Sequence, residues 1–307
     1  MYNMNGLGDS SREIFFDVQE KDVFFMAWDE GYSSTPLENH KVITRDHAIP
    51  LGLVKNTYRT VKNEEVFLPL EEEIINFFDP SLLEEVKVVD HILKKGAVCY
   101  SEYIFPKQKQ GETYKELETR SGHKTSFTLR FIIQNSYDGS CSVKFYGGNI
   151  DGFCTNGMII GEYDFAKAKH TKNFSADQFR LQLSQTLVNF NESVAKLQQY
   201  ADTLIQPYQT TLVQDLFRKL TKGDTDEPKR KNSLSDKLFA QFVDEQTDRG
   251  SNVFAVTSAL TNYASHDSER FSLTKTGDGG TLLKRQERVR SWLNSDTFKH
   301  FVESVAA

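Results

Sequence analysis

One segment near the middle of the chain restricts the fold more than any other feature of the sequence. Apolar side chains occupy every second position of residues 127–134, namely Phe127, Leu129, Phe131 and Ile133, as in a strand with one buried face. The dipeptide Asp138-Gly139 follows, and glycine accepts the positive φ that a tight turn requires. A second alternating run follows the turn and contains Cys141, Val143 and Phe145. These patterns predict an antiparallel hairpin over residues 127–146.

The N-terminal part of the chain consists of short apolar runs separated by turn residues, which predicts brief strands. The runs lie at residues 15–18, 23–28, 51–55 and 97–105. Residues 64–78 instead repeat their apolar side chains at helical spacing, and Pro80 ends that run. Residues 106–124 are polar, charged and poor in aliphatic side chains, so we expect a long exposed loop that leads into the hairpin.

Helical periodicity dominates the C-terminal half of the chain. The longest apolar stripe covers residues 175–206 and begins at Ser175 and Gln178, which resemble a capping box. Further helices are expected at residues 212–220, 235–245, 253–264 and 284–305, the last broken near Asn294, and residues 222–233 have the composition of a linker. We therefore predict an α+β fold. An N-terminal and central antiparallel sheet region, residues 1–174, is followed by a mainly helical half, residues 175–307, that packs on it.

Composition and length limit the class of protein. With 307 residues the chain can bury a core without disulfides. Its three cysteines, Cys99, Cys141 and Cys154, are odd in number and lie in apolar or strand-like stretches, which favours buried thiols in a reducing compartment. The polar start lacks the pattern of a signal peptide, and no apolar run approaches the roughly 18 residues of a membrane span. We expect a cytoplasmic protein with no membrane partner.

Recognisable catalytic and metal-binding motifs are absent from the sequence. It contains no GxxxxGK[ST] loop, no GxSxG elbow, no CxxC and no HExxH, so we predict no enzymatic motif, no cofactor and no metal. Polar residues nonetheless concentrate at the hairpin and in the glycine-rich stretch behind it: Asn135, Asp138, Asp151, Cys154, Asn156 and His170. They form either a ligand or catalytic site, or hydrogen bonds that stabilise turns, and both interpretations stay open.

The same region resembles a known family. The stretches IIQNSYDGSCSVKF, GFCTNGMIIG and KAKHTKNF are similar to the central signature of the phage/plasmid-like proteins gathered as domain of unknown function 932. The matching residues are Asn135, Asp138, Gly139, Cys154, Asn156, Gly157 and His170. Residues 45–67 and 252–266 resemble further parts of that family, whereas Gly157-Met158 stands where the family commonly has Thr-Leu. The resemblance implies that the gene is of phage or plasmid origin. If a phage encodes the protein, we expect it to act in the host cytoplasm. The resemblance assigns no activity.

A basic and aromatic surface on the hairpin favours nucleic-acid binding despite a formal net charge of -6. We expect a single-stranded DNA-binding protein of phage replication or recombination, which neutralises phosphates with cations and stacks bases on aromatic rings. The expected contacts on the hairpin are Arg130, Tyr137, Lys144 and Tyr146. The preceding loop adds Lys107, Lys109, Lys115, Arg120 and Lys124, and a second basic cluster contains Lys167, Lys169, His170 and Lys172.

Two other classes of function stay open at this point. One is a metal-dependent enzyme acting on nucleic acid or nucleotide, with Asp138, Asp151 and His170 as acid, base or Mg²⁺-binding groups. The other is a structural or host-interaction protein whose interface is the helix at residues 175–206. The sequence does not distinguish RNA from DNA as the ligand, and homo-oligomerisation is equally open.

Overall fold

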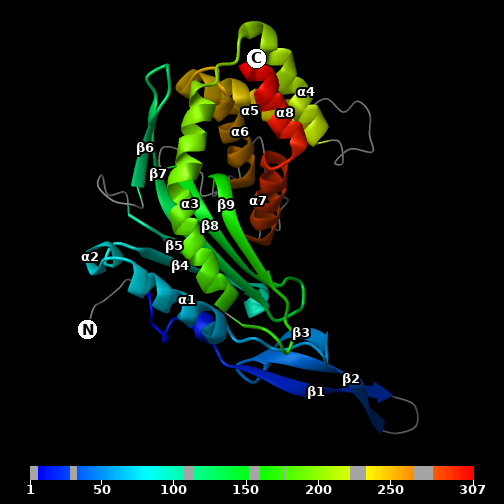
Figure 1. Cartoon of the computed structure of the whole chain (residues 1–307). Helices are drawn as coiled ribbons and strands as arrows, with labels where there is room; N and C mark the ends of the chain where they lie inside the picture. Colours follow the sequence, from blue (N-terminus) through cyan, green and yellow to red (C-terminus); the bar gives the residue numbers. More distant parts are fainter. Residues whose placement is uncertain are drawn as a thin grey trace. The chain divides into compact units, whose positions relative to one another are not determined.

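The computed structural model describes residues 6–27, 33–106, 114–151, 160–175, 177–221, 233–265 and 279–307. These residues form antiparallel sheets in the N-terminal and central regions and helices in the C-terminal half (Figure 1). The predicted α+β fold is therefore confirmed. No helix within those ranges is long and apolar enough to cross a lipid bilayer.

The chain folds into two compact units that are interleaved along the sequence. Unit 1 comprises Met1–Pro106, Arg130–Gly147 and Asp164–Thr186, and unit 2 comprises Lys107–Leu129, Gly148–Tyr163 and Leu187–Ala307. Several strands and one helix therefore continue from one unit into the other. The division into residues 1–174 and 175–307 stays a prediction.

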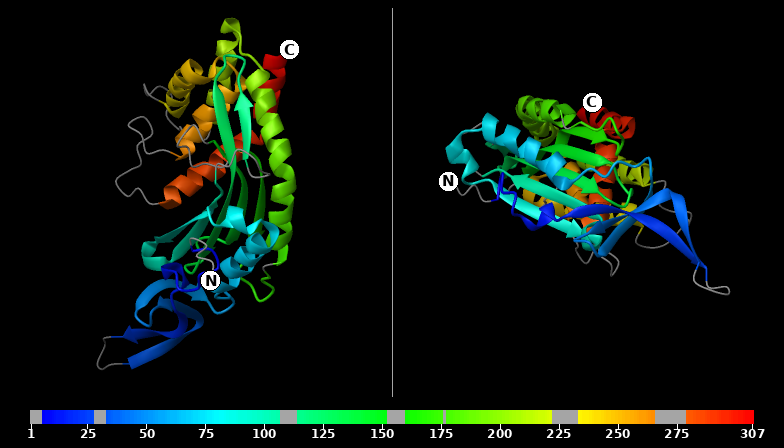
Figure 2. Two further views of the ribbon diagram at one scale, coloured as in Figure 1. Left: turned by 90° about the vertical axis from the view of Figure 1, so that its left-hand side faces the viewer. Right: turned by 90° about the horizontal axis from the view of Figure 1, so that it is seen from below.

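The first sheet belongs to unit 1 and has three antiparallel strands in the order β1-β2-β3. β1 (Val18–Ala27) pairs with β2 (Ser33–Arg45) from end to end, whereas β3 (Ile49–Lys55) pairs only with the inner part of β2. Figure 2 shows the outer part of the β1–β2 hairpin extending beyond β3. The inner part covers a small hydrophobic core, made of Val18, Ile43, Leu51, Val54, Ala97 and Tyr137.

The second sheet has six strands in the order β4-β5-β7-β8-β9, with β6 also pairing with β7. The strands are β4 Lys87–Leu93, β5 Val98–Ile104, β6 Tyr114–Glu118, β7 Lys124–Ser136, β8 Val143–Asp151 and β9 Ile160–Ala168. The predicted hairpin is confirmed as β7 and β8, with wider bounds than the alternation indicated. The strand expected at residues 97–105 is β5.

The loop expected at residues 106–124 is wrong in part. Tyr114–Glu118 forms β6, which pairs with β7 from Tyr114↔Thr128 to Glu118↔Lys124. Its aliphatic side chain, Leu117, is buried, and pairing with β7 stabilises a strand that composition alone assigns to a loop. Residues 107–113 lie outside the described residues.

Helix α1 (Asn63–Phe77) confirms the helix expected at residues 64–78. Its buried side chains recur at the spacing of one helix face and include Val66, Phe67, Leu70 and Ile74. Glu71 on the same helix is also buried. Arg12 and Tyr103 both donate hydrogen bonds to its carboxylate and so compensate for its burial. Pro80 not only follows α1 but begins the short helix α2 (Pro80–Leu83).

Helix α3 (Asp177–Asp202) continues through both units and corresponds to the long helix expected at residues 175–206. Within unit 1 it packs so closely on β8 that a Cβ on Gly147 would lie 2.6 Å from the Cγ2 of Thr186. Within unit 2 its apolar stripe is buried at Phe190, Val194 and Leu197. This part of the stripe therefore packs in the interior of the protein.

Beyond α3, the described part of unit 2 contains five α-helices, preceded by a short 3-10 helix, Pro207–Gln209. They are α4 Thr210–Leu220, α5 Leu234–Arg249, α6 Val253–Ser265, α7 Gly279–Leu293 and α8 Asp296–Ala306. They confirm the expected helices and the break near Asn294, where the Ser295 Oγ caps α8 by accepting the amide of Phe298 at 3.3 Å. Almost all of the linker expected at residues 222–233 lies outside the described residues.

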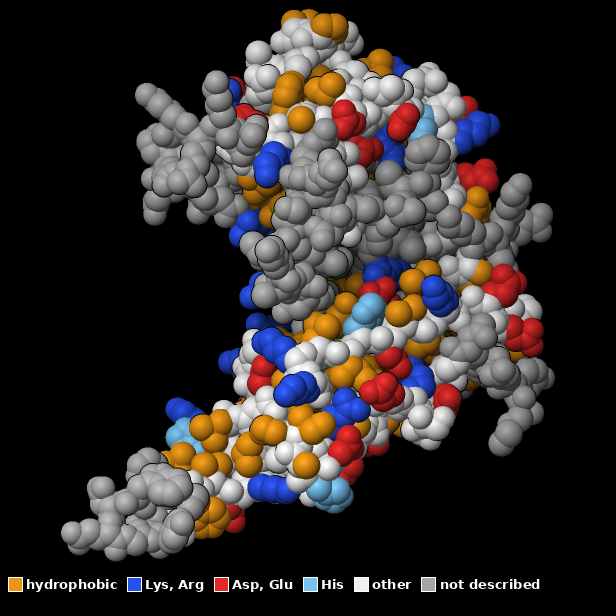
Figure 3. Space-filling view, turned by 180° about the vertical axis from the view of Figure 1, so that it is seen from behind, with side chains coloured by type: hydrophobic (Ala, Val, Ile, Leu, Met, Phe, Trp, Pro, Cys, Tyr) orange, Lys and Arg blue, Asp and Glu red, His pale blue; other side chains and the backbone are white. Residues whose placement is uncertain are grey.

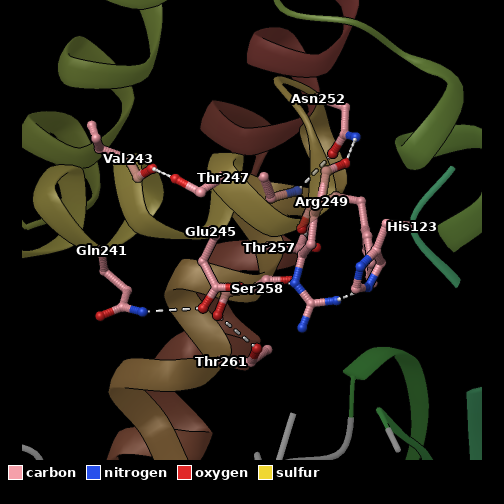
Figure 4. Close-up of polar contacts among 12 residues, drawn as sticks. His123, Gln241, Val243, Glu245, Thr247, Arg249, Asn252, Thr257, Ser258 and Thr261 are labelled. Atoms are coloured by element: carbon pink, nitrogen blue, oxygen red, sulfur yellow. Dashed lines mark hydrogen bonds and ion pairs between the residues drawn. The ribbon is translucent and has the colours of Figure 1, made fainter. Parts of the chain in front are cut away.

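Helix α6 is buried along nearly its whole length. Asn252 caps it, since the Asn252 Oδ1 accepts the amide of Ala255 at 2.8 Å. Figure 4 shows the polar groups beside α6: Arg249 forms an ion pair with Glu245 at 2.8 Å, and the Arg249 Nη1 lies 3.4 Å from the Nε2 of His123. Both charges are buried and paired, as charges in a core need to be. The described part of the family-like stretch, residues 252–265, therefore forms part of the core of unit 2.

Candidate nucleic-acid interface

A groove in unit 1 brings together much of the polar cluster that the sequence indicated. Its volume is about 690 Å³, and it is lined by the end of β3, the β7–β8 turn, the start of β8, the end of β9 and the segment after β9. Figure 1 shows β3 beside the lower ends of β8 and β9. Four lysines line the groove, Lys55, Lys144, Lys167 and Lys169, and we call it the lysine groove.

The lysine groove is positively charged within a chain whose formal net charge is -6. Asp138 is the one carboxylate among its described lining residues, and the Nζ of Lys94 lies 3.6 Å from the Asp138 Oδ2. Three of the four lysines are exposed, and Lys144 is half-buried. In the view of Figure 3, by comparison, Lys and Arg side chains are mixed with Asp and Glu over the lower described part of the face. Positive charge is therefore concentrated in the lysine groove, where four lysines meet one carboxylate.

Two glycines bring β3 and the β7–β8 turn together. A Cβ on Gly52 would lie 2.5 Å from the Cα of Asp138, so β3 approaches the turn this closely only because position 52 has no side chain. Gly139 in the turn has a φ of 72°, a conformation that residues with a Cβ rarely adopt. Because β3 ends at Lys55 and Lys144 lies at the start of β8, this approach places both lysines on one groove.

The hairpin residues of the family signature form turn and core hydrogen bonds. Asn135 is completely buried, and its Nδ2 donates to a backbone carbonyl and to the Asn63 Oδ1, both at 2.9 Å. The Ser136 Oγ donates to the carbonyl of Cys141 at 2.7 Å. The Asp138 Oδ1 accepts the amide two residues further on at 2.9 Å. These contacts are the ones that the turn-stabilising interpretation requires.

His170 lies in the wall of the lysine groove and is almost completely buried. Its ring stacks on Tyr58 with 4.7 Å between the centroids, and the Tyr58 Oη donates to the carbonyl of Ser136 at 2.7 Å. Burial lowers the pKa of His170 to about 4, although backbone groups of Arg59 and Cys141 oppose the shift, so the ring is neutral at pH 7. Neither ring nitrogen has a well-formed hydrogen bond to a described residue. The ring nitrogens therefore lie near backbone groups of Arg59 and Cys141, which favour the protonated ring, but form no well-formed hydrogen bond with them.

The hairpin contacts expected at Arg130, Tyr137 and Tyr146 are buried. Every residue from 127 to 137 is buried, so both faces of β7 are covered at these positions. Arg130 forms an ion pair with Glu102, and the Tyr137 Oη accepts the amide of Asn63 at 2.9 Å. The expectation of an exposed basic and aromatic face on the hairpin is wrong, because the polar members of the alternation pack inside the protein instead of meeting water.

The other expected cations do not all reach the groove. Lys172 is exposed in the segment after β9. Arg120 and Lys124, with Lys115, belong to unit 2, where the Arg120 Nε lies 3.9 Å from Asp202 and the Lys124 Nζ lies 3.3 Å from Glu118. The residues Lys107, Lys109, Cys154, Asn156 and Gly157 lie outside the described residues, and the side chain of Asp151 is not described.

Sequence patterns missed Lys55 as a groove residue. Nothing in its immediate surroundings distinguishes it from an ordinary solvated cation. A usable signal lies at Gly52, because a glycine inside an apolar strand indicates a close backbone approach, and Lys55 follows on the same strand. Within the described ranges, no three or more His, Cys, Asp and Glu side chains gather as a metal site requires.

The fold and the groove together define an α+β protein with a cationic groove built around a hairpin turn. A family model described as Domain of unknown function (DUF932) matches residues 50–292, which is most of the chain. The chain belongs to this family, and the family resemblance expected from the sequence is confirmed. No curated protein and no solved structure was found to match the chain.

Proposed function

We propose that this protein binds single-stranded nucleic acid, DNA in the first instance, and that the lysine groove holds the phosphates. The observation that carries the proposal is the convergence of four lysines and a single carboxylate on one groove. Lysines that neutralise phosphates release the counterions condensed on the nucleic acid, and this release drives binding. A role in phage or plasmid replication or recombination is part of the same proposal, and RNA is the alternative ligand.

The groove supports phosphate neutralisation more strongly than base stacking. Tyr137 and Tyr146 are buried, and one face of the half-buried Tyr58 already stacks on His170. Open aromatic rings add roughly 1–3 kcal/mol per stacked base in other single-strand binders, and the groove offers little of that surface. We therefore expect modest affinity, little sequence preference and a strong dependence on salt.

Titration of a fluorescently labelled oligothymidylate, followed by anisotropy, tests the proposal. Four phosphate contacts predict a slope of log K against log salt of about -2.8 for a single strand, so the affinity falls about 50-fold between about 50 and 200 mM salt. An RNA oligonucleotide of the same length decides between the two ligands. Absence of binding at low salt, or binding that salt does not weaken, would refute the proposal.

Two charge-matched triple variants test whether the groove is the site. The groove variant is Lys55→Gln/Lys167→Gln/Lys169→Gln, and its salt slope should fall to about -0.7 because one lysine remains. The control variant removes the same charge at exposed positions outside the groove lining, Lys87→Gln/Lys219→Gln/Lys284→Gln. It should keep nearly the slope of the unmodified protein. Equal losses in both variants would place the site elsewhere.

His170 supports a second candidate function, an enzyme acting on nucleic acid or nucleotide. His170 and Asp138 line the same groove, and an imidazole and a carboxylate are residue types that serve in general acid–base catalysis. Incubation of the oligonucleotide with Mg²⁺ or Mn²⁺ would then give cleavage products, and His170→Gln or Asp138→Asn would abolish them. An intact oligonucleotide under these conditions would leave binding as the function.

A further inference from the structure

The two cysteines that the structure describes have very different surroundings. Cys99 lies in β5 and is completely buried, and burial raises the pKa of its thiol to about 12. Cys141 follows the β7–β8 turn, is only half-buried and lines the lysine groove. Neither cysteine is in a disulfide. The expectation of a buried thiol therefore holds for Cys99 and is wrong for Cys141, which the turn brings to the surface.

The lysine groove has the features of a site that activates a thiol. Nearby cations stabilise a thiolate, and four lysines line the same groove as Cys141. His170 lines it too, and its ring nitrogens are buried without a well-formed hydrogen bond to a described residue. The backbone of Cys141 is close enough to His170 to raise the pKa of the imidazole, against the larger opposite effect of burial. The groove thus combines a half-buried cysteine and a cationic surrounding that favours the thiolate, with a buried imidazole in the same wall.

We propose that Cys141 is a redox-sensitive modification site that controls the access of anionic ligands to the lysine groove. The control of ligand binding rests on the function proposed above, whereas the reactivity of the thiol does not. Peroxide is the oxidant: the Sγ thiolate attacks one oxygen of hydrogen peroxide, an S–O bond forms and the O–O bond breaks. The hydroxide that leaves takes up the thiol proton and becomes water. Sulfur loses two electrons, peroxide gains them, and the product is a sulfenic acid.

Modification of Cys141 changes the groove in two ways. The added oxygen occupies space between the groove lysines and a bound phosphate. A second molecule of peroxide, reduced to water in the same way, converts the sulfenic acid to a sulfinate. The sulfinate carries a negative charge that repels phosphate and attracts the groove lysines. Oxidation therefore opposes the binding of any anionic ligand in the groove.

Peptide-level mass spectrometry of the native full chain tests the reactivity, with Cys99 as the internal control. Its thiolate fraction is at least roughly 1,000-fold below that of a thiol with an ordinary pKa of about 8.5. Iodoacetamide should therefore label Cys141 while Cys99 stays unmodified, and peroxide followed by dimedone should mark Cys141. In denatured protein both cysteines should label alike. Similar labelling rates for the two cysteines in native protein, or no dimedone adduct at Cys141, overturn the proposal.

Oligonucleotide titration of peroxide-treated protein tests the control of binding. Oxidised protein should bind the labelled oligothymidylate at least about tenfold more weakly than untreated protein, and dithiothreitol should reverse the effect of a brief treatment. In Cys141→Ser the ratio of treated to untreated affinity should be one. Unchanged binding after complete oxidation of Cys141 overturns the control of access. Absence of binding by untreated protein would instead overturn the proposed function, and the labelling result would still decide the reactivity of the thiol.

Discussion

Gly52 on β3 is the position where the smallest change should disturb the groove most. An added Cβ would lie 2.5 Å from the Cα of Asp138, 2.9 Å from its Cβ and 3.0 Å from the carbonyl oxygen of Tyr137. Backbone atoms cannot rotate away as a flexible side chain can, so Gly52→Ala must move β3 and the turn apart. Overpacking of this kind costs up to about 3 kcal/mol. Alanine also restricts the unfolded chain more than glycine does, and this gain offsets less than about 1 kcal/mol of the overpacking cost. We therefore expect a net loss of about 2 kcal/mol in the free energy of unfolding.

Circular dichroism during thermal unfolding measures the effect of Gly52→Ala. A loss of about 2 kcal/mol lowers Tm by roughly 4–8 °C for a chain of a few hundred residues. Leu53→Ala, at the exposed neighbour on the same strand, is the control and should change stability by less than about 0.5 kcal/mol. Gly52→Ala should also weaken oligonucleotide binding, because Lys55 and Lys144 move apart. An alanine variant as stable as the unmodified protein would show that β3 and the turn do not approach each other this closely.

Four further predictions concern buried polar groups and use urea unfolding as the measurement. The pKa of His170 is about 4 in the folded protein against 6.5 ordinarily, so as the pH falls the unfolded state takes up the proton first. Stability should drop by about 3 kcal/mol between these two pH values, and a drop of the same size in His170→Phe would contradict the assignment. For Glu102, burial would raise the pKa, but His91 and Arg130 outweigh burial and lower it. Glu102→Gln should therefore be less stable than the unmodified protein at pH 7, and the difference should shrink as the pH falls below the ordinary value near 4.5; a difference independent of pH would refute this. Arg130→Met leaves Glu102 buried without its cation and should cost about 3–5 kcal/mol, of which Arg130→Met/Glu102→Gln should recover part; no recovery would argue against the ion pair. Asn135→Ala removes three buried hydrogen bonds and should cost about 2–3 kcal/mol; a loss below about 0.5 kcal/mol would show that they contribute little.

Elements with strong local patterns were predictable from the sequence. The alternation from Phe127 to Ile133 and the Asp138-Gly139 turn predicted β7 and β8, and helical spacing predicted α1 and α6. β2 and β9 escaped prediction, because Ser33–Arg45 is largely polar and Ile160–Ala168 interrupts its apolar residues with charged ones. A strand of this kind becomes recognisable only through its partner strands, and pairing across the sequence is not a local property.

The candidate site was predictable only in part, for a related reason. Lys144, Lys169 and His170 were singled out by local charge, and the structure places them on one groove. Lys55 comes from a strand more distant in the chain, and its place depends on the register of β3 beside the turn. Arg130 shows the opposite error, because alternation identifies two faces of a strand without revealing whether the polar face meets water or the interior. The interior burial of Arg130 depends on tertiary packing that no local pattern contains.

The interleaving of the two units affects how the chain can be divided. β7, β8, β9 and α3 each contribute residues to both units, so neither unit corresponds to one uninterrupted stretch of polypeptide. A fragment ending at residue 174 would lack the α3 residues that belong to unit 1, and a fragment starting at residue 175 would lack the β6–β7 residues that belong to unit 2. Truncated fragments should therefore aggregate or be degraded by proteases, and the two units should fold only within the same uninterrupted chain.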